Sequence, residues 1–116
     1  MIKTKEEYIN NTALNTAKQI ITEEIQMAGY KVEAIYLFGS RARGDYKKDS
    51  DWDFFVVTDR DLSKEDYIEI ALHIRRKMAK NNILNDIIIK SESLFEHQKT
   101  GTGFLSYYVN KEGITI

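Results

Sequence analysis

The chain has 116 residues, of which 42% are hydrophobic and 30% are charged, so it is typical of a globular protein with one two-layer core. Its net charge of −1 provides no global positive field that would draw it onto nucleic acid or an anionic membrane. The lack of cysteine excludes disulfides, thiolate zinc sites and thiol nucleophiles. Without an apolar leader or a run of transmembrane length, we expect a cytoplasmic protein with a single domain over residues 1–116.

The first third of the chain predicts a helix and then a buried strand. Thr4 and Glu7 fit a capping box, and Gly29 is suited to end the helix that follows. Apolar residues recur between them at three- and four-residue steps, namely Tyr8, Leu14, Ala17, Ile21, Ile25 and Ala28. The segment 32–38 is short, β-branched and aromatic, which indicates an interior strand that ends at Gly39.

A second interior strand is predicted at residues 52–58, and a third strand, apolar apart from one carboxylate, at residues 86–89. A helix is predicted between them, with a cap at Ser63 and an end near Asn81 and Asn82. Its apolar stripe consists of Tyr67, Ile70, Ala71, Ile74 and Met78.

The C-terminal part predicts smaller elements. A short helix after Ser91, a second one over residues 104–109 and a terminal strand at 114–116 are expected. Strands that alternate with covering helices predict an α/β or α+β fold, in which helices cover a small sheet. The pattern leaves the directions of the strands open.

Two carboxylates stand at the mouth of the apolar strand 52–58. Side chains alternate along a strand, so Asp51 and Asp53 should share one face while Trp52 points to the other. Like charges this close repel, and a hard divalent cation such as Mg²⁺ would remove the repulsion. Asp86 begins another apolar strand and is the candidate third ligand. Three carboxylates could hold two Mg²⁺ ions that remain net positive and attract a polyphosphate.

The turn before these carboxylates is predicted to bind phosphate. Gly39 lets the backbone approach a ligand closely, and Ser40 offers a hydroxyl. If Ser40 begins a helical turn, free backbone amides would also face the anion. Arg41 and Arg43 lie within reach of the same place and suit phosphate through their planar guanidinium groups, and Ser50 could cap or orient the loop that follows.

Each of these features has a simpler explanation when taken alone. A Gly-Ser turn carries little information, and two aspartates near a strand start are usually solvated. Lys47 and Lys48 most simply form a solvated loop, and Asp86 could cap an element or pair with a lysine. Their combination in one chain favours a site for a metal-bound nucleoside triphosphate.

Other polar and aromatic residues are assigned no catalytic role. His73 and His97 lack ligand spacing to another histidine, so a zinc site is not expected. Asp59 and Asp61 follow the strand 52–58, at its far end from Asp53, and are rejected as the third ligand. The pair Tyr107–Tyr108 is predicted to lie in the core, although a partner surface is the alternative.

The segment GSRARGDYKKDSDWDFFVV resembles the signature of the DNA polymerase β-like nucleotidyltransferase superfamily, in which Gly-Ser precedes Asp-x-Asp. Its short spacing and GSRARG opening are most similar to the minimal nucleotidyltransferases, the MNT domain of HEPN–MNT toxin–antitoxin pairs. The resemblance covers nearly the whole chain and implies a polymerase β-like core with a small mixed sheet.

By this resemblance Gly39 and Ser40 would bind the triphosphate, and Asp51 and Asp53 would bind both Mg²⁺ ions. Asp86 would complete the catalytic metal site and orient the acceptor hydroxyl or take its proton. Arg43 matches a frequent arginine of the group, whereas Trp52 replaces the usual small aliphatic residue on the face away from the metals.

Three functions remain open at this point. The first is a protein adenylyltransferase that acts as an antitoxin by moving AMP from ATP to a hydroxyl, expected to be a tyrosine, of a HEPN ribonuclease toxin. The second is a small-molecule nucleotidyltransferase, similar to the aminoglycoside-modifying enzymes, that builds its pocket between subunits. The third is an antitoxin without catalysis that covers its toxin.

Overall fold

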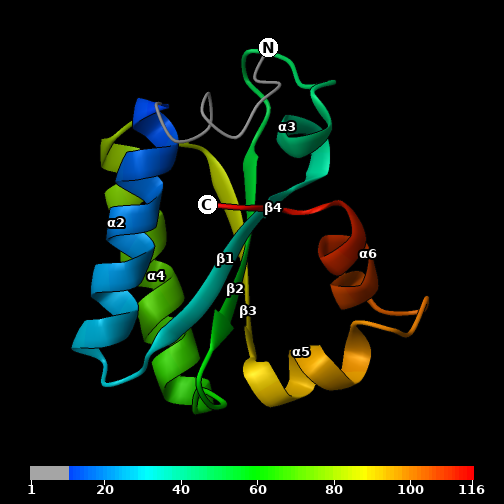
Figure 1. The fold of residues 1–116 in the computed structure, drawn as a ribbon. Coiled ribbons are helices and arrows are strands. Elements are labelled where there is room, and N and C mark those ends of the chain that lie inside the picture. The colour runs from blue at the N-terminus through cyan, green and yellow to red at the C-terminus, as the bar shows by residue number, and fades with distance from the viewer. Residues whose placement is uncertain (1–10) are drawn as a thin grey trace.

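The computed structural model describes residues 11–116, which form a four-stranded sheet with helices on both faces (Figure 1). In chain order the elements are α2 (Thr12–Met27), β1 (Val32–Phe38), α3 (Gly39–Arg43), β2 (Trp52–Thr58), α4 (Lys64–Lys80), β3 (Asn85–Ser91), α5 (Glu92–Gln98), α6 (Leu105–Glu112) and β4 (Ile114–Thr115). The predicted mixture of strands and covering helices is confirmed. The expected capping box at Thr4 and Glu7 lies outside the described residues.

The sheet has the order β3-β2-β1-β4 and is mixed. β1 runs antiparallel to β2 and to β4, whereas β2 and β3 are parallel because α4 carries the chain back between them. In this arrangement the end of β1 meets the beginnings of β2 and β3 at one end of the sheet. Phe38 is paired with Asp53, and Asp53 is paired with Asp86.

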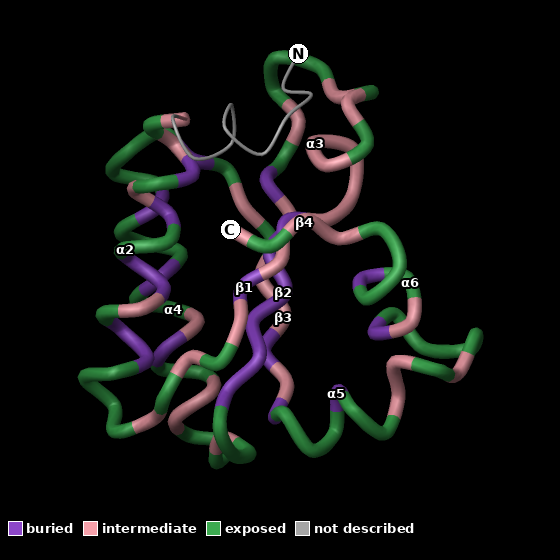
Figure 2. The backbone as a smooth tube through the Cα atoms, in the orientation of Figure 1, coloured by how far each residue is buried: buried purple, intermediate pink, exposed green. Residues whose placement is uncertain are grey.

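Each face of the sheet has its own hydrophobic core. On one face α2 and α4 lie side by side over Ile35, Leu37, Phe54 and Val56, and their buried residues include Ile21 and Ile74. On the other face Phe95 of α5 and Val109 of α6 pack against Phe55 and Val57. In Figure 2 the buried backbone runs along β2, between the helices of the two faces. Because adjacent residues of β2 point to opposite faces, the two cores lie back to back across one strand.

Side chains cap the first turns of α2, α4 and α5. Ser63 accepts a hydrogen bond from the Asp66 amide (3.1 Å), which satisfies a free N–H at the start of α4 as the sequence predicts. Asn11 does the same for the Leu14 amide (3.2 Å) at the start of α2. Ser91 caps α5 through the Leu94 amide (3.2 Å), which confirms the short helix expected there.

The prediction that Tyr107 and Tyr108 belong to the core is wrong for Tyr108. Its side chain is 49% exposed on α6, and Tyr107 packs edge-on against it with ring centroids 5.1 Å apart. α6 is short and turns only one side, with Val109 and Ser106, toward the sheet.

None of the helices in residues 11–116 is both long and apolar enough to cross a membrane.

Candidate active site

Three aspartates gather where β1 ends and where β2 and β3 begin. Asp53 lies opposite Asp86 in the parallel pair, and Asp51 directly precedes β2. Asp53 is on the same face of β2 as Phe55, and Asp86 is on the same face of β3 as Ile88. The carboxylates therefore lie on the face that α5 and α6 cover. Trp52 is buried in the core of the opposite face, as predicted.

The electrostatics of Asp53 reflect this gathering. Partial burial raises the pKa of its carboxyl group above the usual value, and the negative charges of Asp86 and then Asp51 raise it further. The positive charge of Arg43 acts in the opposite direction on this pKa. Asp51 and Asp86 are exposed. Arg43 thus compensates the charged form of Asp53 only in part, and a bound cation would supply the rest.

The carboxylates of Asp51, Asp53 and Asp86 offer only oxygen donors, which fits Mg²⁺, but as they are arranged they do not coordinate an ion by themselves. Among residues 11–116, no group of three or more acidic, histidine or cysteine side chains is arranged to hold a metal. Mg²⁺ commonly binds through one or two carboxylates and completes its shell with water and substrate phosphates. The aspartates therefore fit an ion that arrives together with a phosphate.

The Gly-Ser turn lies directly beside these carboxylates. Gly39 has a φ of +74°, a conformation that other residues rarely adopt, and a Cβ built on it would overlap Oδ2 of Asp53. Ser40 follows within the five-residue helix α3, so the helical turn considered for it in the sequence is present and begins one residue earlier, at Gly39. α3 ends at Gly44, whose amide donates to the Ser40 carbonyl (2.9 Å).

Arg41, one of the two arginines expected to bind phosphate, contacts the loop that leads to Asp51. Its guanidinium lies 4.5 Å from the ring centre of Tyr46 and 4.3 Å from that of Trp52. It donates to the carbonyls of Ser50 (2.9 Å) and Lys48 (3.2 Å). Arg41 therefore holds this loop in shape, and its contact with phosphate stays a prediction.

Ser50 also shapes this loop. Its hydroxyl accepts a hydrogen bond from the Lys47 amide (2.8 Å), which confirms that it caps the loop, while its predicted contact with the nucleotide stays untested. Arg43 is mostly exposed and pairs with Asp45 (3.3 Å). Lys47 and Lys48 are exposed, as expected for a solvated loop.

Asp59 lies at the opposite end of β2, as the sequence predicts. Its carboxylate accepts hydrogen bonds from the Lys31 amide (2.8 Å) and from Arg60 (2.8 Å). The first of these bonds is the main cause of its lowered pKa. Asp59 therefore stabilises a turn at the end of β2 that lies away from Asp51, Asp53 and Asp86.

A cavity of about 310 Å³ adjoins the Gly39 turn. One wall comes from β1 and α3 and consists of Phe38, Gly39, Ala42 and Arg43. The other wall is one side of α6 and consists of Leu105, Tyr108, Val109 and Glu112. The α6 wall is not among the sites expected from the sequence, although its four residues recur at the three- and four-residue steps of one helix face.

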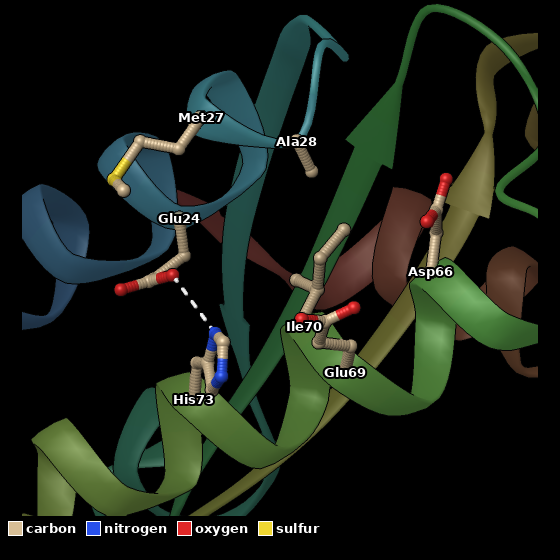
Figure 3. A pocket seen from close by; sticks show the side chains of 7 residues that line it. All are labelled: Glu24, Met27, Ala28, Asp66, Glu69, Ile70 and His73. Atoms are coloured by element: carbon tan, nitrogen blue, oxygen red, sulfur yellow. Dashed lines mark ion pairs between the residues drawn. The ribbon is translucent and has the colours of Figure 1, made fainter.

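A second cavity, of about 240 Å³, lies between α2 and α4 (Figure 3). His73 points toward the buried carboxylate of Glu24, with Nδ1 3.5 Å from Oε2. Lys77 also pairs with Glu24 (2.5 Å), and this hydrogen bond is the main cause of the raised pKa of Lys77. The network joins the two helices on the face away from the aspartates. Glu24 is three residues after Ile21 and seven after Ala17, so its helical spacing does place it on the buried face of α2.

Known proteins share both the sequence pattern and the fold. The profile of the family described as "Polymerase beta, Nucleotidyltransferase" matches residues 18–112. A protein of Methanocaldococcus jannaschii, provisionally named a protein adenylyltransferase, is 40% identical over 65 residues, or 56% of this chain. The chain spans 60% of the length of that relative. A crystal structure from Sulfolobus solfataricus, provisionally named a nucleotidyltransferase, superimposes with a TM-score of 0.56 at 23% identity, over 99% of this chain and 89% of the other.

Proposed function

The chain belongs to the polymerase beta nucleotidyltransferase family, and from that premise we propose that it transfers AMP from ATP to a hydroxyl group of another protein. The observation that carries this proposal is the convergence of three aspartates beside a turn that only glycine can occupy. The pairing of Asp53 with Asp86 brings two of them together, and Asp51 precedes the same strand.

The proposed reaction assigns a separate task to each part of the site. Asp51 and Asp53 would hold two Mg²⁺ ions, and Asp86 would complete the site of one of them. The bound Mg²⁺ would neutralise the charge on the phosphates. The turn at Gly39 and Ser40 would hold the triphosphate close to the backbone. In this reaction the acceptor hydroxyl would form a bond to the α-phosphorus as the bond to pyrophosphate breaks, and Asp86 would take the proton.

The acceptor we propose is a tyrosine of a HEPN ribonuclease toxin, which the modification would silence. Three observations support a protein acceptor. The GSRARG turn is similar to that of the MNT antitoxins, and the Methanocaldococcus jannaschii relative is provisionally named a protein adenylyltransferase. Asp51 and Asp86 are also exposed, so a partner's side chain can reach them.

The test is intact-mass analysis of a HEPN partner after co-expression with this chain. We expect the partner to gain whole AMP units with the wild type and none with the double variant Asp51→Ala and Asp53→Ala. A matched control, Asp59→Ala with Asp61→Ala, removes two carboxylates with the same spacing from the opposite end of β2 and should leave transfer intact.

The same experiment separates the proposal from its alternatives. If labelled ATP modifies an aminoglycoside and not the partner, the protein-acceptor proposal is wrong. If the double variant at Asp51 and Asp53 neutralises the toxin as fully as the wild type, neutralisation occurs by occlusion and does not need transfer.

A further inference from the structure

We propose that the cavity between α3 and α6 binds the nucleobase of the donor nucleotide, with Tyr108 stacking on the base and Glu112 selecting its exocyclic amino group. This inference rests on the proposed function, because it assigns the part of ATP that the aspartates and the Gly39 turn leave unbound. The cavity is bounded by α6, which the signature motif does not include.

The position of the cavity supports this assignment. Phe38, on the cavity wall, is paired with Asp53 at the end of the sheet where the three aspartates gather. Val109, on the opposite wall, packs against Phe55 on the face of β2 that also carries Asp53. The cavity therefore opens on the same face and at the same end of the sheet as the carboxylates.

The cavity is also continuous with the turn proposed to hold the phosphates. Gly39 lines the cavity and at the same time touches Asp53 so closely that no side chain fits between them. Arg43, whose charge acts on Asp53, also lines the cavity. A molecule with its phosphates at this turn could thus place its remaining part between α3 and α6 without leaving the protein surface.

The chemistry and size of the cavity suit a nucleoside. Tyr108 and Leu105 are 49% and 37% exposed, so α6 presents part of an aromatic ring and part of an aliphatic side chain at the surface of the described residues 11–116. Such surfaces bind the flat faces of bases by stacking. The volume of about 310 Å³ lies at the lower end of small-ligand sites, about 300–1,000 Å³, and suits a nucleoside better than a protein segment.

Glu112 supplies the polar group at this wall. A carboxylate accepts hydrogen bonds and cannot donate them, so it attracts an amino group of a base and repels a carbonyl oxygen at the same position. Adenine carries an amino group where hypoxanthine carries a carbonyl oxygen. The cavity is therefore expected to favour ATP over ITP.

Calorimetry with ATP and with inorganic tripolyphosphate, each with Mg²⁺, tests the base site. Tyr108→Ala should weaken ATP binding about tenfold, because stacking on the base is lost, and should leave tripolyphosphate binding unchanged. Tyr108→Phe keeps the ring and should bind ATP like the wild type. Ile68→Ala, at an exposed apolar residue of α4, is the matched surface control.

The outcomes distinguish this inference from the function on which it rests. If Tyr108→Ala binds ATP as tightly as the wild type, or if the wild type binds tripolyphosphate as tightly as ATP, the base site is wrong and the transferase proposal stands. If the wild type binds neither compound, both proposals are wrong. Thermal melting of Tyr108→Ala shows whether the variant is folded. If it is not, the comparison of ATP with tripolyphosphate on the wild type still decides whether a base site exists.

Glu112→Gln tests the selection of the base. Glutamine can donate as well as accept a hydrogen bond, so the preference for ATP over ITP should fall while tripolyphosphate binding stays unchanged. An unchanged ATP-to-ITP ratio would contradict the role assigned to Glu112.

Discussion

Gly39 is constrained by its backbone and by its neighbour at the same time. Its φ of +74° disfavours any residue with a Cβ, and the position of that missing Cβ is taken by the carboxylate of Asp53. Gly29 has a similar φ of +92° but open space around it. A side chain at position 29 would therefore introduce backbone strain alone, whereas a side chain at position 39 would also clash with Asp53.

Gly39→Ala should abolish nucleotide transfer, because the new methyl group displaces Asp53 from its place beside the turn. Gly29→Ala should leave transfer intact. Both substitutions should destabilise the fold by about 1 kcal/mol through the unfavourable φ, with a further loss at Gly39 from the clash. Transfer assays and urea unfolding of the two variants measure these effects. Transfer at the wild-type rate by Gly39→Ala would contradict the close approach.

At the scale of elements, the loop between α3 and β2 decides where Asp51 and Asp53 lie. Arg41 closes this loop through two carbonyls and two aromatic rings, one of them Trp52 at the start of β2. Because Arg41 follows Gly-Ser, it is expected from the sequence to bind phosphate. The local sequence does not show that the rings of Tyr46 and Trp52 pack against its guanidinium.

Arg41→Lys tests this positioning role, because lysine keeps the charge and loses the planar fork that bonds two carbonyls and stacks between rings. We expect kcat for transfer to fall about tenfold or more as Asp51 and Asp53 lose their alignment, with little change in the KM for ATP. A direct phosphate ligand would instead raise the KM. Arg75→Lys, at an exposed position of α4, is the control for the substitution itself.

At the scale of the whole molecule, the site reduces the stability of the fold. The pKa of Asp53 is raised above 3.8, chiefly by burial, so its ionised form is less favourable in the folded than in the unfolded state. Above both pKa values this cost is fully present. As the pH falls through the folded pKa toward 3.8, the folded state takes up the proton first and the cost disappears.

Asp53→Asn should therefore raise the melting temperature at neutral pH while it abolishes transfer. The difference from the wild type should shrink as the pH falls through the folded pKa of Asp53. Mg²⁺ should stabilise the wild type more than the variant, because a ligand stabilises the state that binds it. Melting curves over a pH series measure this, with Asp61→Asn as the surface control. A variant no more stable than the wild type at neutral pH would contradict the unfavourable charge.

Much of the fold could be predicted because its signals are local. The strands at 32–38 and 52–58 were predicted with the bounds that the structure has, and Ser63 caps α4 as its spacing indicates. The Gly-Ser turn and the paired aspartates stand close enough in the chain to be recognised as one site. Alternation along a strand also placed Trp52 and Asp53 on opposite faces correctly.

What the sequence by itself determined is thus the set of elements, the family signature and the residues that carry its chemistry, because these depend on neighbours a few positions apart. Only the tertiary structure decided the parallel pairing that brings Asp86 to Asp53, the slot that holds Arg41, and the cavity that α6 closes against Gly39. The physical reason is that strand direction and cavities arise from packing between distant segments, whose geometry no local pattern contains.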